Sequence, residues 1–356
     1  MKSLVMKYKL ICLLISASLL VACEKDPIDT KGNAISFNNS PARAAVVPNE
    51  QNGLVDNARV WGYYVNGSNT TWVWGNATTN ATVGEKANLE ITKDENNNLT
   101  GTGGLIINGN TKYWFDGEYD FFSIYSEKCI NGALEPTFSD GTLSFDYDIS
   151  DQKELRYACH LNTVGTTIRT DKVDFNYQHL LTKIKFQGFS TDASNPITVT
   201  KVEISSIPQQ ATVSLNVAGA TGIDTKSLTA TYAKVGTSTG LTTENSSGWV
   251  CDKDNGYVVF EKMVFPQSVT ATTANPEEQT IPDGAVKFTV TYNTSSETGK
   301  TKSAFLPFST WEAGKSYLYK FKIQPSGPII FGGVELEPWR NGTLVNNGII
   351  DFPTEY

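Results

Sequence analysis

A short alternation of apolar and polar residues is the feature that most restricts the fold of this chain. Every second residue is apolar or aromatic in several segments, whereas no long stretch keeps a helical period with caps. The clearest segments are Leu143–Ile149, Val213–Val217, Leu228–Tyr232, Val286–Tyr292 and Tyr317–Ile323. Successive side chains of a strand point to opposite faces, so this period predicts strands that turn one face to a core.

Turn residues separate these segments at short intervals. Gly and Asn accept the positive φ of tight turns, and they cluster at residues 66–69, 108–110 and 254–256. Short strands joined by such turns favour β-sandwiches over parallel α/β units. We therefore predict an all-β chain.

The length of 356 residues suits two domains with separate cores. The alternation changes phase between Phe175–Tyr177 and Leu180–Phe186, which indicates a junction near residue 170. We predict an N-terminal β-sandwich domain at residues 44–170 and a C-terminal one at residues 171–356.

The N-terminus has the features of an export signal. Lys2, Lys7 and Lys9 precede an apolar run that is too short to span a bilayer, so residues 1–22 are predicted to be a signal peptide. The run ends in Leu20–Cys23, where small residues before a cysteine suit a lipoprotein signal peptidase. We predict lipidation of Cys23, since two or more acyl chains give stable anchoring. The alternative is a plain secretory peptide. Residues 23–43 are polar for the most part and suit a tether.

Charge and cysteine content exclude some partners. Loss of residues 1–22 removes three lysines, leaving 26 basic and 37 acidic residues, a net charge of −11. Such a chain is not expected to bind nucleic acid. Cys129, Cys159 and Cys251 allow at most one disulfide, and their spacing matches no metal site. Buried free thiols are the simpler interpretation.

No pattern of catalytic residues is found. The chain has two histidines, His160 and His179, and Cys159 points to the opposite face of a strand from His160. Phosphate-binding loops, zinc motifs and calcium loops are absent from the sequence. We predict that the protein is not an enzyme and needs no cofactor or metal. Trp61, Trp72 and Trp74 are candidate glycan contacts, with the core of a hairpin as the alternative.

Several local patterns resemble the fimbrillin superfamily of Bacteroidetes, envelope lipoproteins that assemble into type V fimbriae. They occur in the family's order at Tyr119–Tyr125, Asp151–Ala158, Phe175–Phe186, Val264–Gln267, Trp311–Tyr319 and Pro338–Trp339. The polar stretch Glu24–Pro27 resembles the surface-export tag of lipoproteins from the same phylum. The resemblance implies two tandem transthyretin-like, Greek-key β-sandwiches in a surface-exposed lipoprotein of the outer membrane or a fimbrium.

The resemblance also implies assembly with other fimbrial subunits, and a role in adhesion. An Arg-specific protease removes an N-terminal strand from shaft subunits of the family, and a strand from a neighbour replaces it. Here the candidate removable strand is Ala34–Asn38, and Arg43 follows it between small residues that suit an exposed cleavage loop. Arg43 as a solvated charge is the alternative. Arg59 is a poorer candidate, because it leads directly into an apolar strand.

The tail supplies candidate donor residues for such an exchange. They are Leu344, Val345, Ile349, Ile350 and Phe352. The alternative is a last strand packed within its own domain, which would suit a tip or accessory subunit better than a shaft subunit. A glycan-binding surface lipoprotein of a polysaccharide uptake system is the alternative function.

Overall fold

The computed structural model describes the chain from residue 32 to residue 339, with gaps. The described ranges are 32–40, 58–66, 69–74, 76–77, 82–83, 85–93, 99–106, 111–129, 137–139, 142–192, 195–216, 229–235, 239–278, 280–324, 326–337 and 339. These residues form strands and one short 3-10 helix, η2 (Glu127–Cys129), which confirms the all-β prediction. None of the described helical residues belongs to a helix long and apolar enough to cross a bilayer.

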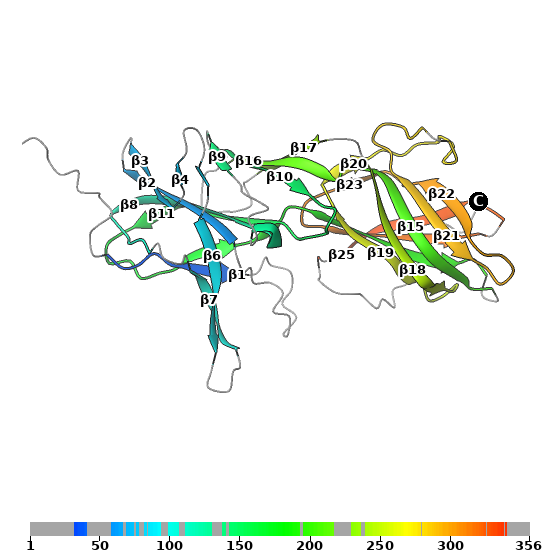
Figure 1. Cartoon of the computed structure of the whole chain (residues 1–356), viewed down its shortest axis with the longest axis horizontal. Helices are drawn as coiled ribbons and strands as arrows, with labels where there is room; N and C mark the ends of the chain where they lie inside the picture. Colours follow the sequence, from blue (N-terminus) through cyan, green and yellow to red (C-terminus); the bar gives the residue numbers. More distant parts are fainter. Residues whose placement is uncertain are drawn as a thin grey trace, which may run out of the picture.

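The strands of the N-terminal half, as seen on the left of Figure 1, come first in the chain. They are β1 (Phe37–Ser40), β2 (Ala58–Asn66), β3 (Asn69–Trp74), β4 (Asn76–Ala77), β5 (Thr82–Val83), β6 (Glu85–Lys93), β7 (Leu99–Ile106), β8 (Gly117–Tyr125), β9 (Thr137–Ser139), β10 (Thr142–Asp148), β11 (Arg156–Gly165), β12 (Val173–Asn176) and β13 (Gln178–His179).

The remaining strands follow. They are β14 (Thr182–Ser190), β15 (Ile197–Ile207), β16 (Gln210–Asn216), β17 (Thr229–Val235), β18 (Thr239–Cys251), β19 (Tyr257–Val264), β20 (Gln267–Val269), β21 (Lys287–Asn293), β22 (Lys300–Phe305), β23 (Ser309–Trp311), β24 (Ser316–Ile323) and β25 (Ile329–Glu337).

The C-terminal half is a sandwich of two four-stranded sheets. One has the order β19-β14-β24-β25, with β14 and β24 parallel, and the other has the order β18-β15-β21-β22. Alternate residues of the strands meet between the sheets, as the sequence period predicts. Phe186, Phe288 and Tyr319 are fully buried there, and the ring of Phe186 lies 4.7 Å from that of Phe288.

The N-terminal half has a sheet that is buried on both faces. Its order is β13-β11-β8-β2-β6-β7, with β3 also paired to β2. The buried side chains form a larger cluster, which we call the main core, and a smaller one, which we call the second core. On β8, Phe122 and Ile124 face the main core, whereas Tyr119 and Phe121 face the second core. A six-stranded sheet, β17-β16-β10-β9-β5-β4, contributes Leu143 and other residues to the main core. The pair β1-β12 closes the second core, so the central strands lie between two layers.

Strand pairing in the N-terminal half crosses the predicted domain junction near residue 170. β12 lies beyond that position, yet it pairs with β1 in parallel. The hairpin β16–β17 comes still later, and β16 pairs along its whole length with β10, from Thr142↔Asn216 to Asp148↔Gln210. The hairpin therefore completes a sheet begun by earlier strands, because its apolar face, with Val213 and Leu215, packs over the central strands.

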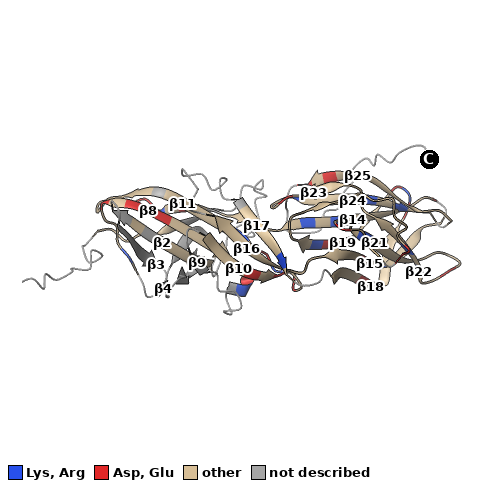
Figure 2. Cartoon of the chain, turned by 90° about the horizontal axis from the view of Figure 1, so that it is seen from above, with Lys and Arg blue, Asp and Glu red and all other residues tan. Residues whose placement is uncertain are grey.

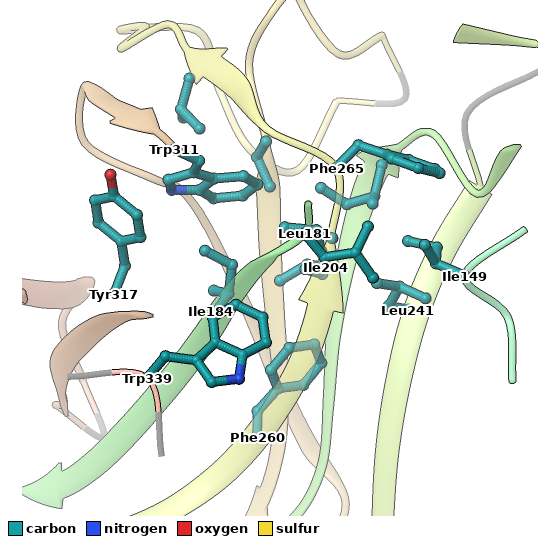
Figure 3. Close-up of a cluster of buried hydrophobic side chains, with 14 of the residues drawn as sticks. Ile149, Leu181, Ile184, Ile204, Leu241, Phe260, Phe265, Trp311, Tyr317 and Trp339 are labelled. Carbon is teal, nitrogen blue, oxygen red and sulfur yellow. The ribbon is translucent and has the colours of Figure 1, made fainter. Parts of the chain in front are cut away.

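The two halves share one continuous core. Figure 3 shows Ile149, which follows β10, in the same buried cluster as Phe265 and Trp311 of the C-terminal half. The side-chain amide of Gln152 also joins the halves. It donates to the Met263 carbonyl at 3.1 Å and accepts the Met263 amide at 2.6 Å, so it completes the edge of β19 as a neighbouring strand would.

Candidate functional site

The strongest candidate is the surface on which β1 lies, which we call the first-strand seat: Trp114, Phe121, Val173 and Phe175. Phe37 stacks on Phe175 with ring centroids 4.9 Å apart and an angle of 6°, and it meets Phe121 edge-on at 5.4 Å. Ile35 and Phe37 are the two residues of this segment that belong to the second core. The first strand is therefore an integral part of that core.

Backbone hydrogen bonds hold the same segment on two sides. On one side the Ile35 amide donates to the Lys112 carbonyl at 2.8 Å, and the Trp114 amide donates to the Asn33 carbonyl at 3.0 Å. On the other side the Val173 amide donates to the Ser36 carbonyl at 2.8 Å, and Phe37 lies opposite Val173 in the parallel pair. Removal of the segment would leave both sets of partners unpaired.

The sequence of β8 explains why this surface needs a cover. Tyr119, Phe121 and Ser123 point to the same face, because alternate residues of a strand share a face. The ring of Phe121 meets that of Trp114 edge-on at 5.9 Å. Tyr119 also lies against Trp114, and burial raises its pKa to about 12. An aromatic face of this size is costly to expose to water.

A second group of interest lies where the halves meet. His179 Nδ1 is 2.6 Å from Glu154 Oε1, and Arg156 Nη2 is 2.5 Å from Glu154 Oε2. Trp339 stacks on His179 with ring centroids 4.3 Å apart, and Lys183 Nζ lies 4.9 Å from the Trp339 ring centre. Burial lowers the pKa of His179, although Glu154 opposes this effect. These five residues form what we call the junction cluster.

The structure describes only some of the predicted site residues. Cys23, Arg43 and the five tail residues lie outside the described residues, so their roles stay predictions. Of the candidate glycan contacts, Trp61 is fully buried in the main core and has no exposed ring face for a sugar. The side chains of Trp72 and Trp74 on β3 are not described. Arg59, the poorer cleavage candidate, is buried on β2.

The residues considered for catalysis do not form a described site. Cys159 is buried in the main core, and His179 is paired with Glu154. His160 Nδ1 lies 3.1 Å from the Asp174 carbonyl oxygen. Cys159 and Cys251 are buried and are not joined by a disulfide, whereas the side chain of Cys129 is not described. Within the described part of the chain, no three His, Cys, Asp or Glu side chains are grouped to hold a metal ion.

Sequence reasoning predicted a first strand at Ala34–Asn38, which overlaps β1 (Phe37–Ser40), but it missed the first-strand seat and the junction cluster. Phe121 and Phe122 are adjacent, and two neighbouring buried aromatics on one strand indicate that both faces are covered. That signal was present in the sequence. No local sequence pattern connects Glu154, His179 and Trp339, because they are far apart along the chain and meet only in the folded structure.

Comparisons with known proteins give one family. The model of the fimbrillin-like family matches residues 59–339. A fimbrial protein from Bacteroides vulgatus has a similar structure, with 14% identity, 86% of this chain and 99% of that chain covered, and a TM-score of 0.55. A protein from Bacteroides uniformis, assigned to cell adhesion, gives 18% identity, coverage of 86% and 97%, and a TM-score of 0.50. At these identities the likeness concerns the fold. No curated protein matches the sequence.

Proposed function

The chain belongs to the fimbrillin-like family, and from that premise we propose that it is a structural subunit of a cell-surface fimbria. Family membership supports a structural or adhesive role rather than an enzymatic one. In this proposal the chain is exported as a lipoprotein through Cys23, cleaved after Arg43 by an Arg-specific protease, and assembled with other subunits by strand exchange. The bacterial fimbrial protein and adhesion protein of similar fold are consistent with this role.

The single observation that carries the proposal is the position of the first strand. Phe37 is 1% exposed and packs on Phe121 and Phe175, yet β1 ends at Ser40, three residues before Arg43 in the sequence. A cut after Arg43 would separate this strand from the rest of the chain. The strand would then be held by noncovalent contacts alone.

Loss of the strand would create a binding site for another one. It would expose the rings of Trp114, Phe121 and Phe175, together with unpaired backbone groups at Lys112 and Val173. An apolar surface with unpaired amides and carbonyls beside it accepts an extended segment from another chain, since main-chain bonds supply affinity and side-chain pockets supply specificity. The lipid on Cys23 would be removed with the strand, so it would act as a temporary means of delivery.

The proposal is tested with the purified precursor and an Arg-specific protease. We expect a new N-terminus at Ala44, followed by oligomers that resist SDS and appear as a ladder on a gel. Arg43→Lys keeps the charge but removes the cleavage site, so this variant is expected to stay intact and monomeric. Cleavage after Arg43 that yields only monomers would argue against strand exchange.

A further inference from the structure

The segment that leads into β1 lies between two other parts of the N-terminal half. Asn33 is bonded on both sides: its amide donates to the Thr167 carbonyl at 3.2 Å, and its carbonyl accepts the Trp114 amide at 3.0 Å. Thr167 follows β11, and Trp114 precedes β8. We call the two flanking segments, residues 114–116 and 164–169, the glycine clamp, because of the residue that they enclose.

That residue is Gly32, which lies directly against the backbone of both sides of the clamp. A Cβ on Gly32 would be 2.4 Å from the Trp114 carbonyl oxygen and 3.3 Å from the Thr167 carbonyl oxygen. Both neighbours are backbone atoms, which cannot rotate away as the end of a flexible side chain can. Glycine is suited to such a close approach because it has no Cβ. A residue with a side chain therefore fits here only if the two sides of the clamp move apart.

Contacts within the clamp fix the distance between its sides. The Thr167 amide donates to Asp116 Oδ1 at 3.2 Å. The guanidinium carbon of Arg169 lies 4.8 Å from the Trp114 ring centre, and Arg169 Nη1 donates to the Val164 carbonyl at 2.5 Å. Trp114 is fully buried, so this cation–π contact is stronger than an exposed one. Asp116 and Arg169 therefore hold the two sides at a separation that suits glycine.

The side of the clamp that carries Thr167 is also packed tightly where it begins. A Cβ on Gly165 would be 2.3 Å from the Tyr119 ring and 2.6 Å from the Phe115 carbonyl oxygen. The Arg169 amide donates to the Thr166 carbonyl at 2.9 Å, which closes the turn after β11. Because Tyr119 belongs to the second core, movement of this turn would disturb the core.

We propose that the glycine clamp is a specificity filter of the first-strand seat, which accepts an extended segment with glycine at the place of Gly32 and disfavours any larger residue there. With Ile35 and Phe37 in the second core, the pattern that the seat and the clamp recognise together is Gly-x-x-Ile-x-Phe. This pattern occurs once in the whole sequence, at residues 32–37. The clamp therefore favours the first strand of this chain over every other segment of the chain.

The inference deepens the proposed function and rests on it, because selection among strands matters only once a cut after Arg43 has freed β1. The clamp then keeps the freed strand in place, so the aromatic seat stays covered until another strand displaces the first one. An exposed apolar surface of this kind favours aggregation, and the clamp limits the time for which it is exposed.

The first test measures which segment the seat prefers. A recognition sequence for an unrelated protease is inserted after Arg43, so the cut does not depend on the Arg-specific enzyme. The cut protein is mixed in mild urea with labelled synthetic copies of residues 24–43, and the bound copies are compared by mass spectrometry after the urea is removed. We expect the natural copy to bind about tenfold better than a copy with Gly32→Ala, because an added carbon atom overpacks the clamp. A copy with Ala34→Ser adds an atom at an exposed position and should bind like the natural one.

The second test separates a filter from a purely structural role. Arg169→Ala removes the contact over the Trp114 ring, and Asp116→Ala removes the acceptor of the Thr167 amide. Each variant should reduce the preference for the natural copy over the Gly32→Ala copy by about threefold or more. Ile168 is 82% exposed in the same turn, so Ile168→Ala is the matched control and should keep the wild-type preference.

The outcomes distinguish the filter from the proposed function. Weaker binding of both copies with an unchanged preference would show that Arg169 and Asp116 only stabilise the seat, and would overturn the filter. Equal binding of the natural and Gly32→Ala copies by the wild-type protein would also overturn it, while leaving strand exchange in place. If no copy enters the seat, the strand exchange of the proposed function is contradicted, and the filter with it.

Discussion

The two halves of the molecule bury the second face of a sheet in different ways. In the N-terminal half, the central strands β2, β8 and β11 are covered by a separate layer, β1-β12, whose Phe37 packs on Phe121. In the C-terminal half, the corresponding face of β14 and β24 carries Lys183, Lys185 and Lys320, each at most 5% exposed. Carboxylates on the flanking strands β19 and β25 pair with these lysines, and Figure 2 shows the basic residues of β14 in blue.

Under the proposed function, this difference separates an element that another strand would replace from one that stays fixed. In that proposal, an aromatic strand with ordinary backbone pairing is exchanged for another extended segment, because main-chain bonds and apolar packing are not unique to one chain. The lysines and carboxylates belong to strands of the sandwich itself, and removing a carboxylate leaves a buried lysine charge without its partner. We therefore expect strand exchange to be confined to the N-terminal half.

The largest expected effect is the loss of the Phe37 ring. Phe37→Ala should lower the free energy of unfolding of the precursor by about 3–5 kcal/mol, as for other buried phenylalanines. Urea denaturation followed by circular dichroism measures this change. Phe308 is 68% exposed, so Phe308→Ala is the control and should change stability by less than about 0.5 kcal/mol. Equal effects from the two variants would contradict the role of β1 as a core strand.

The next effect concerns the charged face of the C-terminal half. Lys185 Nζ lies 3.3 Å from Glu337 Oε2 and 3.7 Å from Glu261 Oε2. Lys185→Met keeps most of the side-chain volume but leaves Glu337 buried without its partner, which should cost about 3 kcal/mol. Lys201 is 40% exposed and pairs with Glu203 and Glu244, so Lys201→Met should lower the melting temperature far less than Lys185→Met does. Thermal unfolding of both variants provides the comparison.

A smaller effect is expected where the halves meet. Gln152 has a φ of 55°, and its amide makes both hydrogen bonds to the Met263 backbone. Gln152→Asn tolerates the positive φ but cannot reach Met263, so we expect a loss of about 1–2 kcal/mol. Gln210→Asn, which shortens an exposed side chain that donates to Asp148, is the control. If Gln152 couples the halves, its variant should also unfold over a broader temperature range than the wild type.

The smallest effect is a pH dependence of the junction cluster. Burial lowers the pKa of His179 despite the contact with Glu154, while Arg156 and Lys183 also oppose protonation. Below the ordinary histidine pKa of about 6.5, the unfolded chain binds more protons than the folded one, so stability falls as the pH falls. Between about pH 6.5 and 5.5 this loss is at most about 1.4 kcal/mol. His179→Gln should remove this part of the pH dependence.

The control for that measurement is His160→Gln, which leaves the junction cluster intact. Melting temperatures recorded from pH 7.5 to pH 5.5 should fall more steeply for the wild type and the control than for His179→Gln. Glu154 affects the pH dependence of stability at lower pH than His179 does. Burial raises its pKa, but His179 and Arg156 outweigh this effect and keep the pKa below its ordinary value. If the melting temperature of the His179 variant falls with pH as steeply as that of the wild type, the junction cluster does not cause the pH dependence.

Much of the fold was predictable because strand periodicity is a local property. The alternation at Leu143–Ile149 corresponds to β10, and that at Tyr317–Ile323 corresponds to β24, with the expected residues buried. The first strand was predicted at Ala34–Asn38, which overlaps β1 at Phe37–Asn38. The junction cluster was not, since Glu154, His179 and Trp339 lie far apart in the sequence.

The sequence by itself determined which face of each alternating strand is apolar and which family the chain resembles. Tertiary structure alone decided which strands lie side by side. It paired β1 with β12 and extended the sheet of β10 with the later hairpin β16–β17. The physical reason is that alternation specifies an apolar face, but many partners satisfy one apolar face. The choice among them depends on the packing of all the layers at once.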